Sequence, residues 1–352
     1  MSRIDLLLLK RLSGRIGMVM LVFLGLFGLV RSLDAHMIAG LNRDGGPLMV
    51  IGGVTLIALR IVIGTLPVPV VIGTILAVLD LQSRRELTII KATGLSIWRV
   101  LRAPLALAFV AGIVVSFAIE PAVVYLNRLL PVANSPTGSG GELWLEQRGE
   151  DGAYILAAER ARAKGTVLEG VTVFLTGTPN RDRIEATEAR LLPGAWALDG
   201  AVRYRRTSPP EPLADFQVGT VTTAGDMQVR FTFPRDLNFL ELTSALSARI
   251  ADPELRTAVI TTLIRQLALP FLLAGSVLVG FAFTSGYRRT NKHGATVLYG
   301  IVLGFVVYVV TELAGQSGLA GVLDPTFAAA GPAFVAIVIG LTVLLYREDG
   351  RT

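Results

Sequence analysis

Apolar and polar positions divide the chain into three parts. Three long apolar segments come first, a more polar region follows over residues 131–240, and three further apolar segments end the chain. Because a helix of about 20 apolar residues crosses a lipid bilayer, this pattern predicts an α-helical membrane protein with three plus three transmembrane helices. The predicted spans are 15–39, 48–79, 104–126, 259–284, 295–314 and 327–346.

The second predicted span is longer than a bilayer requires, so it must tilt or break. Pro67 and Pro69 lie inside it. Proline removes a helical hydrogen bond and clashes with the preceding turn. We therefore expect this span to kink near these two residues.

The polar region alternates apolar and polar residues in short runs that are bounded by Gly, Pro, Asn and Asp. This period of two is typical of half-buried β-strands, and many short strands indicate a sandwich or jelly roll. The predicted strands include 168–176, 196–204, 216–223 and 227–233. The predicted domains are 1–130 for the first three helices, 131–240 for an inserted β-jelly roll and 241–352 for the last three helices.

Composition agrees with a membrane protein, since 52% of the residues are hydrophobic and 17% are charged. The absence of cysteine excludes disulfides, iron–sulfur clusters and zinc–thiolate sites. The net charge of +6 does not indicate a nucleic-acid partner, because the basic residues lie beside the predicted spans. Fourteen of them fall on one side and only Arg43 in the opposite short loops. By the positive-inside rule both termini are cytoplasmic and residues 131–240 lie outside.

Motifs for chemistry are absent from the sequence. No phosphate-binding Gly-x-x-x-x-Gly-Lys-Ser/Thr loop and no Gly-x-Ser-x-Gly elbow occur. His36 and His293 are predicted on opposite sides of the membrane and cannot share a metal. We therefore expect no enzyme activity, cofactor or metal site in this chain.

Arg31 lies in the outer third of the first predicted span, where a charge is costly. Two interpretations remain open. Arg31 and Asp34 are three residues apart on one helix face, so they could pair and end the span. Alternatively, the guanidinium lines a cavity and binds an anionic lipid headgroup with two hydrogen bonds.

Tyr308, Glu312 and Gln316 recur every four residues and therefore share one face of the fifth span. This face is either an ordinary interfacial one or a polar face toward a central cavity, because carboxylates that face lipid are disfavoured. Glu120, which precedes Pro121, likewise lies near the outer end of the third span.

Residues 82–98 mix charges with apolar side chains and contain a break at Gly94. The usual interpretation is a solvated loop. We favour a short cytoplasmic helix that docks on another protein, because its apolar side chains would otherwise be exposed and because a chain without an ATP site needs a partner that has one. The predicted docking residues are Arg84, Glu86, Leu87, Ile90 and Lys91.

Several segments resemble the LptF/LptG (YjgP/YjgQ) family of lipopolysaccharide export permeases, and the likeness covers nearly the whole chain. They are LVRSLD (29–34), QSRRELTIIKATGLS (82–96), PGAWAL (193–198) and GFVVY (304–308). Residues 82–96 are similar to the family's coupling helix, which is its most recognisable stretch. The first segment favours LptG over LptF.

The resemblance implies the permease subunit of an ABC transporter in a Gram-negative inner membrane. It implies a second LptF/LptG-type subunit, an LptB-like ATPase dimer, and LptC- and LptA-like periplasmic proteins. Lipopolysaccharide would enter between spans one and five, with Arg31 and Asp34 at its headgroup. It would then move along a lipid track in the jelly roll. The predicted track residues are Trp144, Met227, Val229, Phe231 and Phe233.

Two other classes remain possible from the sequence. Permeases of the MacB or FtsX kind also combine an outer domain with a borrowed ATPase, but they have one span before that domain whereas this chain has three. A membrane-anchored scaffold or receptor is the second alternative. It gives no reason for an arginine in the outer part of a span or for a basic docking helix.

Overall fold

The computed structural model describes residues 3–86, 89, 96–128, 143–149, 152–175, 182–205, 208–231, 237–247, 250, 252–284 and 293–348. The chain forms two compact units. One comprises Met1–Val132 and Thr261–Thr352, and the other comprises Ala133–Ile260. The second unit begins close to the predicted start of the β domain at 131 and ends after its predicted end at 240.

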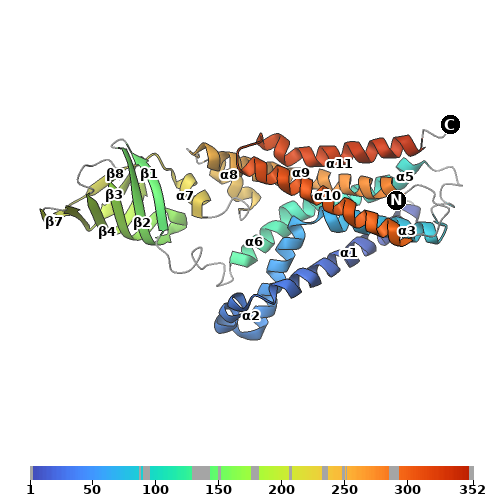
Figure 1. Cartoon of the computed structure of the whole chain (residues 1–352), viewed down its shortest axis with the longest axis horizontal. Helices are drawn as coiled ribbons and strands as arrows, with labels where there is room; N and C mark the ends of the chain where they lie inside the picture. The colour runs from blue at the N-terminus through green and yellow to red at the C-terminus, as the bar shows by residue number, and fades with distance from the viewer. Residues whose placement is uncertain are drawn as a thin grey trace. The chain divides into compact units, whose positions relative to one another are not determined.

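Six helices of the described chain are long and apolar enough to cross a membrane, which confirms the predicted architecture (Figure 1). The shorter apolar helix α3 (Pro67–Ser83) lies between the second and third of them in the sequence. The long helices are α1 (Arg3–Arg31), α2 (Ala35–Gly64), α5 (Ile97–Val114) with its continuation α6 (Glu120–Arg128), α9 (Pro253–Thr284), α10 (His293–Leu319) and α11 (Pro325–Glu348).

The predicted break in the second span is confirmed, because α2 ends at Gly64 and α3 begins at Pro67. Proline suits the first turn of a helix, where its missing N–H has no helical partner to lose. The Thr65 hydroxyl donates to the carbonyl of Ile61 at 3.1 Å and so satisfies one of the last acceptors of α2. α3 is buried along most of its length and packs against both α1 and α10.

The predicted end of the first span at residue 39 is wrong. α1 ends at Arg31, and a new helix, α2, begins at Ala35. The Asp34 carboxylate accepts the N–H of Met37 at 3.2 Å and is therefore the N-cap of α2. The hydrophobic pattern continues across this cap, so hydropathy alone does not reveal it.

The third span contains a π-helical turn, Val115–Ile119, between α5 and α6. Pro121 follows this turn. Proline has no N–H for the helical ladder, and the π turn is a local change in that ladder beside it. Nearby, Gly112 lies against the backbone of Pro270 on α9, where a Cβ atom would not fit. The Ser116 hydroxyl also donates to the carbonyl of Gln266 at 2.9 Å, so the third and fourth spans are closely packed here.

The inserted domain is built on an antiparallel sheet of eight described strands (Figure 1). The strand order is β1-β2-β3-β4-β5-β8, while β6 pairs with β4 and β7 pairs with β6. The predicted strand 196–204 is two strands, because Gly200 turns the chain with a φ of 64°. The strands are β1 (Leu143–Gly149), β2 (Gly152–Arg162), β3 (Val167–Leu175), β4 (Arg183–Leu192), β5 (Ala195–Asp199), β6 (Ala201–Arg205), β7 (Ser208–Leu213) and β8 (Phe216–Gly219).

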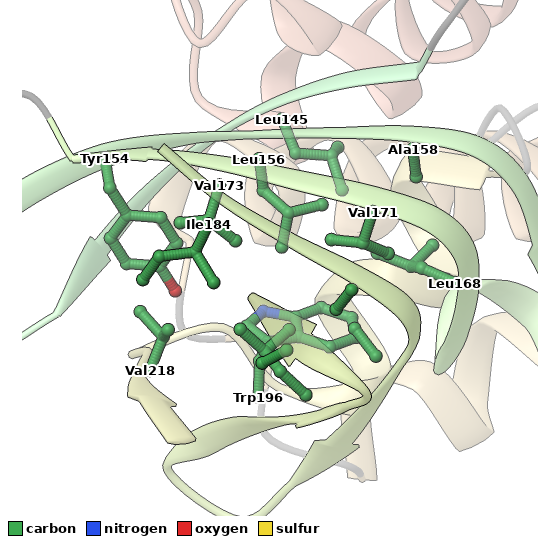
Figure 2. Packing of buried hydrophobic residues seen from close by; sticks show 14 of the residues in the cluster. Leu145, Tyr154, Leu156, Ala158, Leu168, Val171, Val173, Ile184, Trp196 and Val218 are labelled. Carbon is green, nitrogen blue, oxygen red and sulfur yellow. The ribbon is translucent and has the colours of Figure 1, made fainter. Parts of the chain in front are cut away.

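Trp196 is completely buried in the core of this domain. Figure 2 shows Leu156, Val171 and Ile184 directed toward its indole ring. Tyr154 closes one end of the core, where its hydroxyl donates to the carbonyl of Gly219 on β8 at 3.0 Å. Burial raises the pKa of Tyr154 to about 12, so this hydroxyl remains a donor at physiological pH.

The predicted strand 227–233 is wrong, because Ala224–Phe231 forms the helix α7. A capping box starts this helix. The Asp226 carboxylate accepts the N–H of Thr223 at 2.7 Å, and the Thr223 hydroxyl accepts the N–H of Asp226 at 3.2 Å. Met227 is consequently buried in the sheet core rather than directed along a strand face. A second short helix, α8 (Phe239–Ser247), follows.

Candidate functional site

Arg11 on α1 holds two carboxylates at the end of the helical unit where α3 ends. Its Nη1 atom pairs with Asp80 on α3, and its Nη2 atom donates to Glu86 Oε1 at 2.8 Å. Arg15, one turn along α1, reaches Asp80 alone at 3.0 Å. The predicted docking residue Glu86 is therefore attached to α1 over a sequence distance of 75 residues.

The other predicted docking residues fall at or beyond the end of α3. Arg84 Nε lies 3.5 Å from Asp80 Oδ1, and Arg85 adopts a φ of 59° just after the helix. Leu87, Ile90 and Lys91 lie outside the described residues.

Further contacts join four helices at this end. Arg102 on α5 donates to Asp5 on α1 at 3.0 Å. The Gln82 amide on α3 donates to the carbonyl of Thr284, the last residue of α9, at 2.9 Å. The helices α1, α3, α5 and α9 are therefore joined by polar contacts at this end. Sequence patterns did not point to Asp80 or Arg11 as site residues, although Asp80 is a charge that directly follows the long apolar run of the second span.

Within the membrane spans, Tyr308, Glu312 and Gln316 lie in turn along α10. The Gln316 amide donates to Glu312 Oε1 at 2.8 Å, and Arg265 on α9 donates to Glu312 Oε2 at 3.3 Å. Tyr308 packs against Val19 and neighbouring apolar residues of α1 and α3. The Glu312 carboxylate is therefore paired with a cation from the adjacent span.

Glu120 belongs to the same polar cluster. The Gln266 side chain hydrogen-bonds to it, and Arg265 and Arg60 lie close enough to interact with it electrostatically. Two arginines and two glutamates thus meet within the spans, which balances their charges. Arg60 and Arg265 were not among the predicted site residues, although each is a charge inside an apolar run of the sequence.

The backbone N–H of Asp34 donates to the carbonyl of Arg31, but the two side chains do not form an ion pair in the described structure. Both side chains are exposed. Asp34 is occupied as a helix cap, while the Arg31 guanidinium ends α1 without an interaction to another described residue. The interpretation of Arg31 as the ion-pair partner of Asp34 is therefore not what the geometry shows.

Apolar side chains are exposed along the helices that the resemblance assigns to lipid entry. On α1 they include Leu21, Leu26 and Leu29, and on α10 they include Phe305 and Val306. Such apolar faces need lipid, another subunit or an apolar ligand to cover them.

The residues of the predicted lipid track are separated by the fold. Trp144 on β1 is 56% exposed and stacks on Phe174 of β3 with ring centroids 5.7 Å apart. Met227 is buried in the core. The side chains of Val229 and Phe231, and the whole of Phe233, lie outside the described part of the chain. The structure therefore does not bring these residues together as one exposed strip.

Six candidate spans and an inserted antiparallel sheet define a multi-pass membrane protein with one large extramembrane domain. A family model, that of the lipopolysaccharide export system permease LptF/LptG, matches residues 6–347. The chain therefore belongs to the LptF/LptG family. The match covers both helical halves and the β domain, and it does not separate LptF from LptG. A comparison with curated proteins gives no match.

Proposed function

We propose that this chain is a permease subunit of an ABC transporter that extracts lipopolysaccharide from the inner membrane and passes it to a periplasmic bridge. The observation that carries the proposal is the family match over residues 6–347. The exposed apolar faces of α1 and α10 suit acyl chains or a second permease subunit. A separate LptB-like dimer would supply ATP hydrolysis, because the sequence contains no phosphate-binding loop.

We further infer that the ends of the helices near Arg11 and Arg102 are cytoplasmic and that the β domain is periplasmic. The distribution of Lys and Arg supports this orientation. The edge strands of the β domain could join LptC- and LptA-like domains by strand addition. We favour an LptG-type role on the LVRSLD segment at 29–34.

Gentle detergent extraction followed by identification of co-purifying proteins tests the assembly. We expect a second LptF/LptG-type subunit and an LptB-like ATPase. A complex with an ATPase but with only copies of this chain would instead favour a permease of the MacB or FtsX kind. Purification without any ATPase would favour a scaffold.

Glu86→Lys is expected to release most of the ATPase from the purified complex. The substitution reverses the charge of the proposed docking segment and places an ammonium beside the Arg11 guanidinium, which now bonds Glu86 at 2.8 Å. The measurement is the amount of ATPase per permease after co-purification. Glu146→Lys, at an exposed position in the β domain, makes the same charge change elsewhere and should retain the ATPase. Normal ATPase binding and transport by the Glu86 variant would contradict docking at this segment.

Arg31→Glu is expected to lower the lipopolysaccharide retained per purified complex about tenfold or more, because a charge-assisted hydrogen bond contributes about 1.5–3 kcal/mol. Arg31→Lys should retain part of the lipid, since an ammonium attracts phosphate without the two-pronged geometry. Asp34→Asn keeps the cap of α2, because asparagine also caps a helix, and it therefore tests the headgroup role of the Asp34 carboxylate separately. If Arg31→Glu lowers protein yield but leaves lipid per complex unchanged, Arg31 has a structural role instead.

A further inference from the structure

Arg11 is a larger share of the cationic contacts of Glu86 than of those of Asp80. Asp80 is contacted by three guanidinium groups, those of Arg11, Arg15 and Arg84. Among the described residues, Glu86 has an ion pair with Arg11 alone. Its second oxygen, Oε2, is buried without a hydrogen-bond partner in the described structure. Among the described residues, loss of Arg11 would leave Asp80 with two cations and Glu86 with none.

The Arg11 pairs are partly shielded from solvent. The Arg11 side chain is 24% exposed and that of Glu86 is 27% exposed. An ion pair in such a place is screened less by salt than a surface pair and loses more when one partner is removed. The guanidinium also binds two carboxylates in a fixed planar geometry, so a shift of Glu86 relative to α3 must move or break this contact.

The backbone between α3 and Glu86 is constrained. Arg85 adopts a φ of 59°, a left-handed conformation that is unfavourable for a residue with a Cβ atom. Such a conformation persists where surrounding contacts fix it. The Arg11 contact to Glu86 and the Gln82 contact to Thr284 lie on either side of Arg85 and fix the backbone there.

α1 is suited to carry a displacement over a long distance. It is a single helix of 29 residues from Arg3 to Arg31. Arg11 and Arg31 lie about 30 Å apart along its axis at about 1.5 Å per residue. Few residues of its membrane-spanning part are fully buried, and the helix packs against α2, α3 and α5. Packed helices can slide past one another by small amounts as rigid units, so a movement at one end of α1 can reach its other end.

We propose that Arg11 is the positioning residue that couples the ATPase-docking segment to α1, so that displacement of Glu86 by the ATPase moves the helix that carries Arg31. This inference rests on the proposed function, because it requires an ATPase at the docking segment. It assigns to Arg11 a role that neither ATPase binding nor lipid binding requires.

The test uses the full complex of this chain, its second permease subunit and the ATPase in proteoliposomes that contain lipopolysaccharide. Three quantities are measured for each variant: ATPase bound per permease, the rate of ATP hydrolysis, and lipopolysaccharide transferred to an added LptA-like acceptor per ATP hydrolysed. Arg11→Gln is expected to retain the ATPase but to lower lipid transferred per ATP by about threefold or more, the size expected when one residue of a coupling network is removed.

Arg15→Gln is the matched control. It removes a guanidinium from the same helix and the same Asp80 carboxylate but leaves the pair between Arg11 and Glu86 intact. It should transfer lipid per ATP as the native chain does. Arg11→Lys should be intermediate, because one ammonium does not hold two carboxylates as a planar fork does. If Arg11→Gln does not assemble, lipid transferred per ATP is compared between Arg11→Lys and Arg15→Gln, and a lower value for Arg11→Lys supports the coupling role of Arg11.

If the Arg11 and Arg15 variants lose lipid transferred per ATP equally, the cluster only holds the helices together and the proposal is overturned. An unchanged ratio of lipid to ATP in both Arg11 variants would overturn it as well. These outcomes differ from failure of the proposed function. If Glu86→Lys releases the ATPase while the Arg11 variants remain coupled, docking stands and only the role of Arg11 is wrong.

Discussion

Trp196→Ala is expected to destabilise the inserted β domain by about 3–5 kcal/mol, the usual cost of removing a large buried aromatic side chain. Trp196 is 0% exposed and lies at the centre of the domain core (Figure 2). Because domains of this size are stable by only about 5–15 kcal/mol, the loss is a large share of the total. The measurement is the rate at which a protease cleaves the β domain in the purified full-length protein.

Trp144→Ala is the control for this experiment, since it removes the same side chain from an exposed position. It gives up only the stacking contact with Phe174, which is worth about 0.5–1.5 kcal/mol. Cleavage should therefore be much faster for the Trp196 variant than for the Trp144 variant. Equal cleavage rates would contradict the assignment of Trp196 as the centre of the core.

Arg265→Gln is expected to lower the stability of the membrane unit by about 3 kcal/mol, the lower end of the cost of breaking a buried ion pair. The lower end applies because the Arg265 and Glu312 side chains are still 30% and 25% exposed. Without the guanidinium, Glu312 loses its pair with Arg265, and Glu120 loses one of the two positive charges described near it. The measurement is the midpoint of thermal unfolding of the detergent-purified protein.

Glu312→Gln in the Arg265→Gln background is expected to recover part of this loss, because removing both charges leaves no uncompensated carboxylate at this pair. Arg256→Gln provides a matched arginine substitution near the start of α9, outside the polar cluster, and should change the midpoint little. Additive losses in the double variant would show that Arg265 and Glu312 contribute independently.

The helical architecture could be predicted because it depends on local composition. A bilayer demands long apolar helices, so six apolar runs predicted six spans. The break before Pro67 followed from the backbone chemistry of proline. Alternation likewise predicted a β domain, although a period of two in the run that begins at Met227 was misleading. The local signal for a helix in this region is the capping box that Thr223 and Asp226 form, three residues apart.

The candidate site was predicted less well, for a different reason. The spacing of Tyr308, Glu312 and Gln316 correctly placed these residues on one helical face, but it gave no information about what that face meets. Their contacts come from α1, α3 and α9. In the same way, sequence patterns selected Glu86 as a charged residue of a docking segment but did not reveal its pair with Arg11.

The sequence by itself determined the number of spans, the presence of an inserted β domain and the resemblance to a family, because these depend on period, length and local motifs. Only the tertiary structure decided which charges meet. Arg11 and Glu86 are 75 residues apart, and Arg265 and Glu312 are 47 residues apart. An ion pair requires its atoms within a few ångströms, and that proximity is set by how the helices pack rather than by any spacing along the chain.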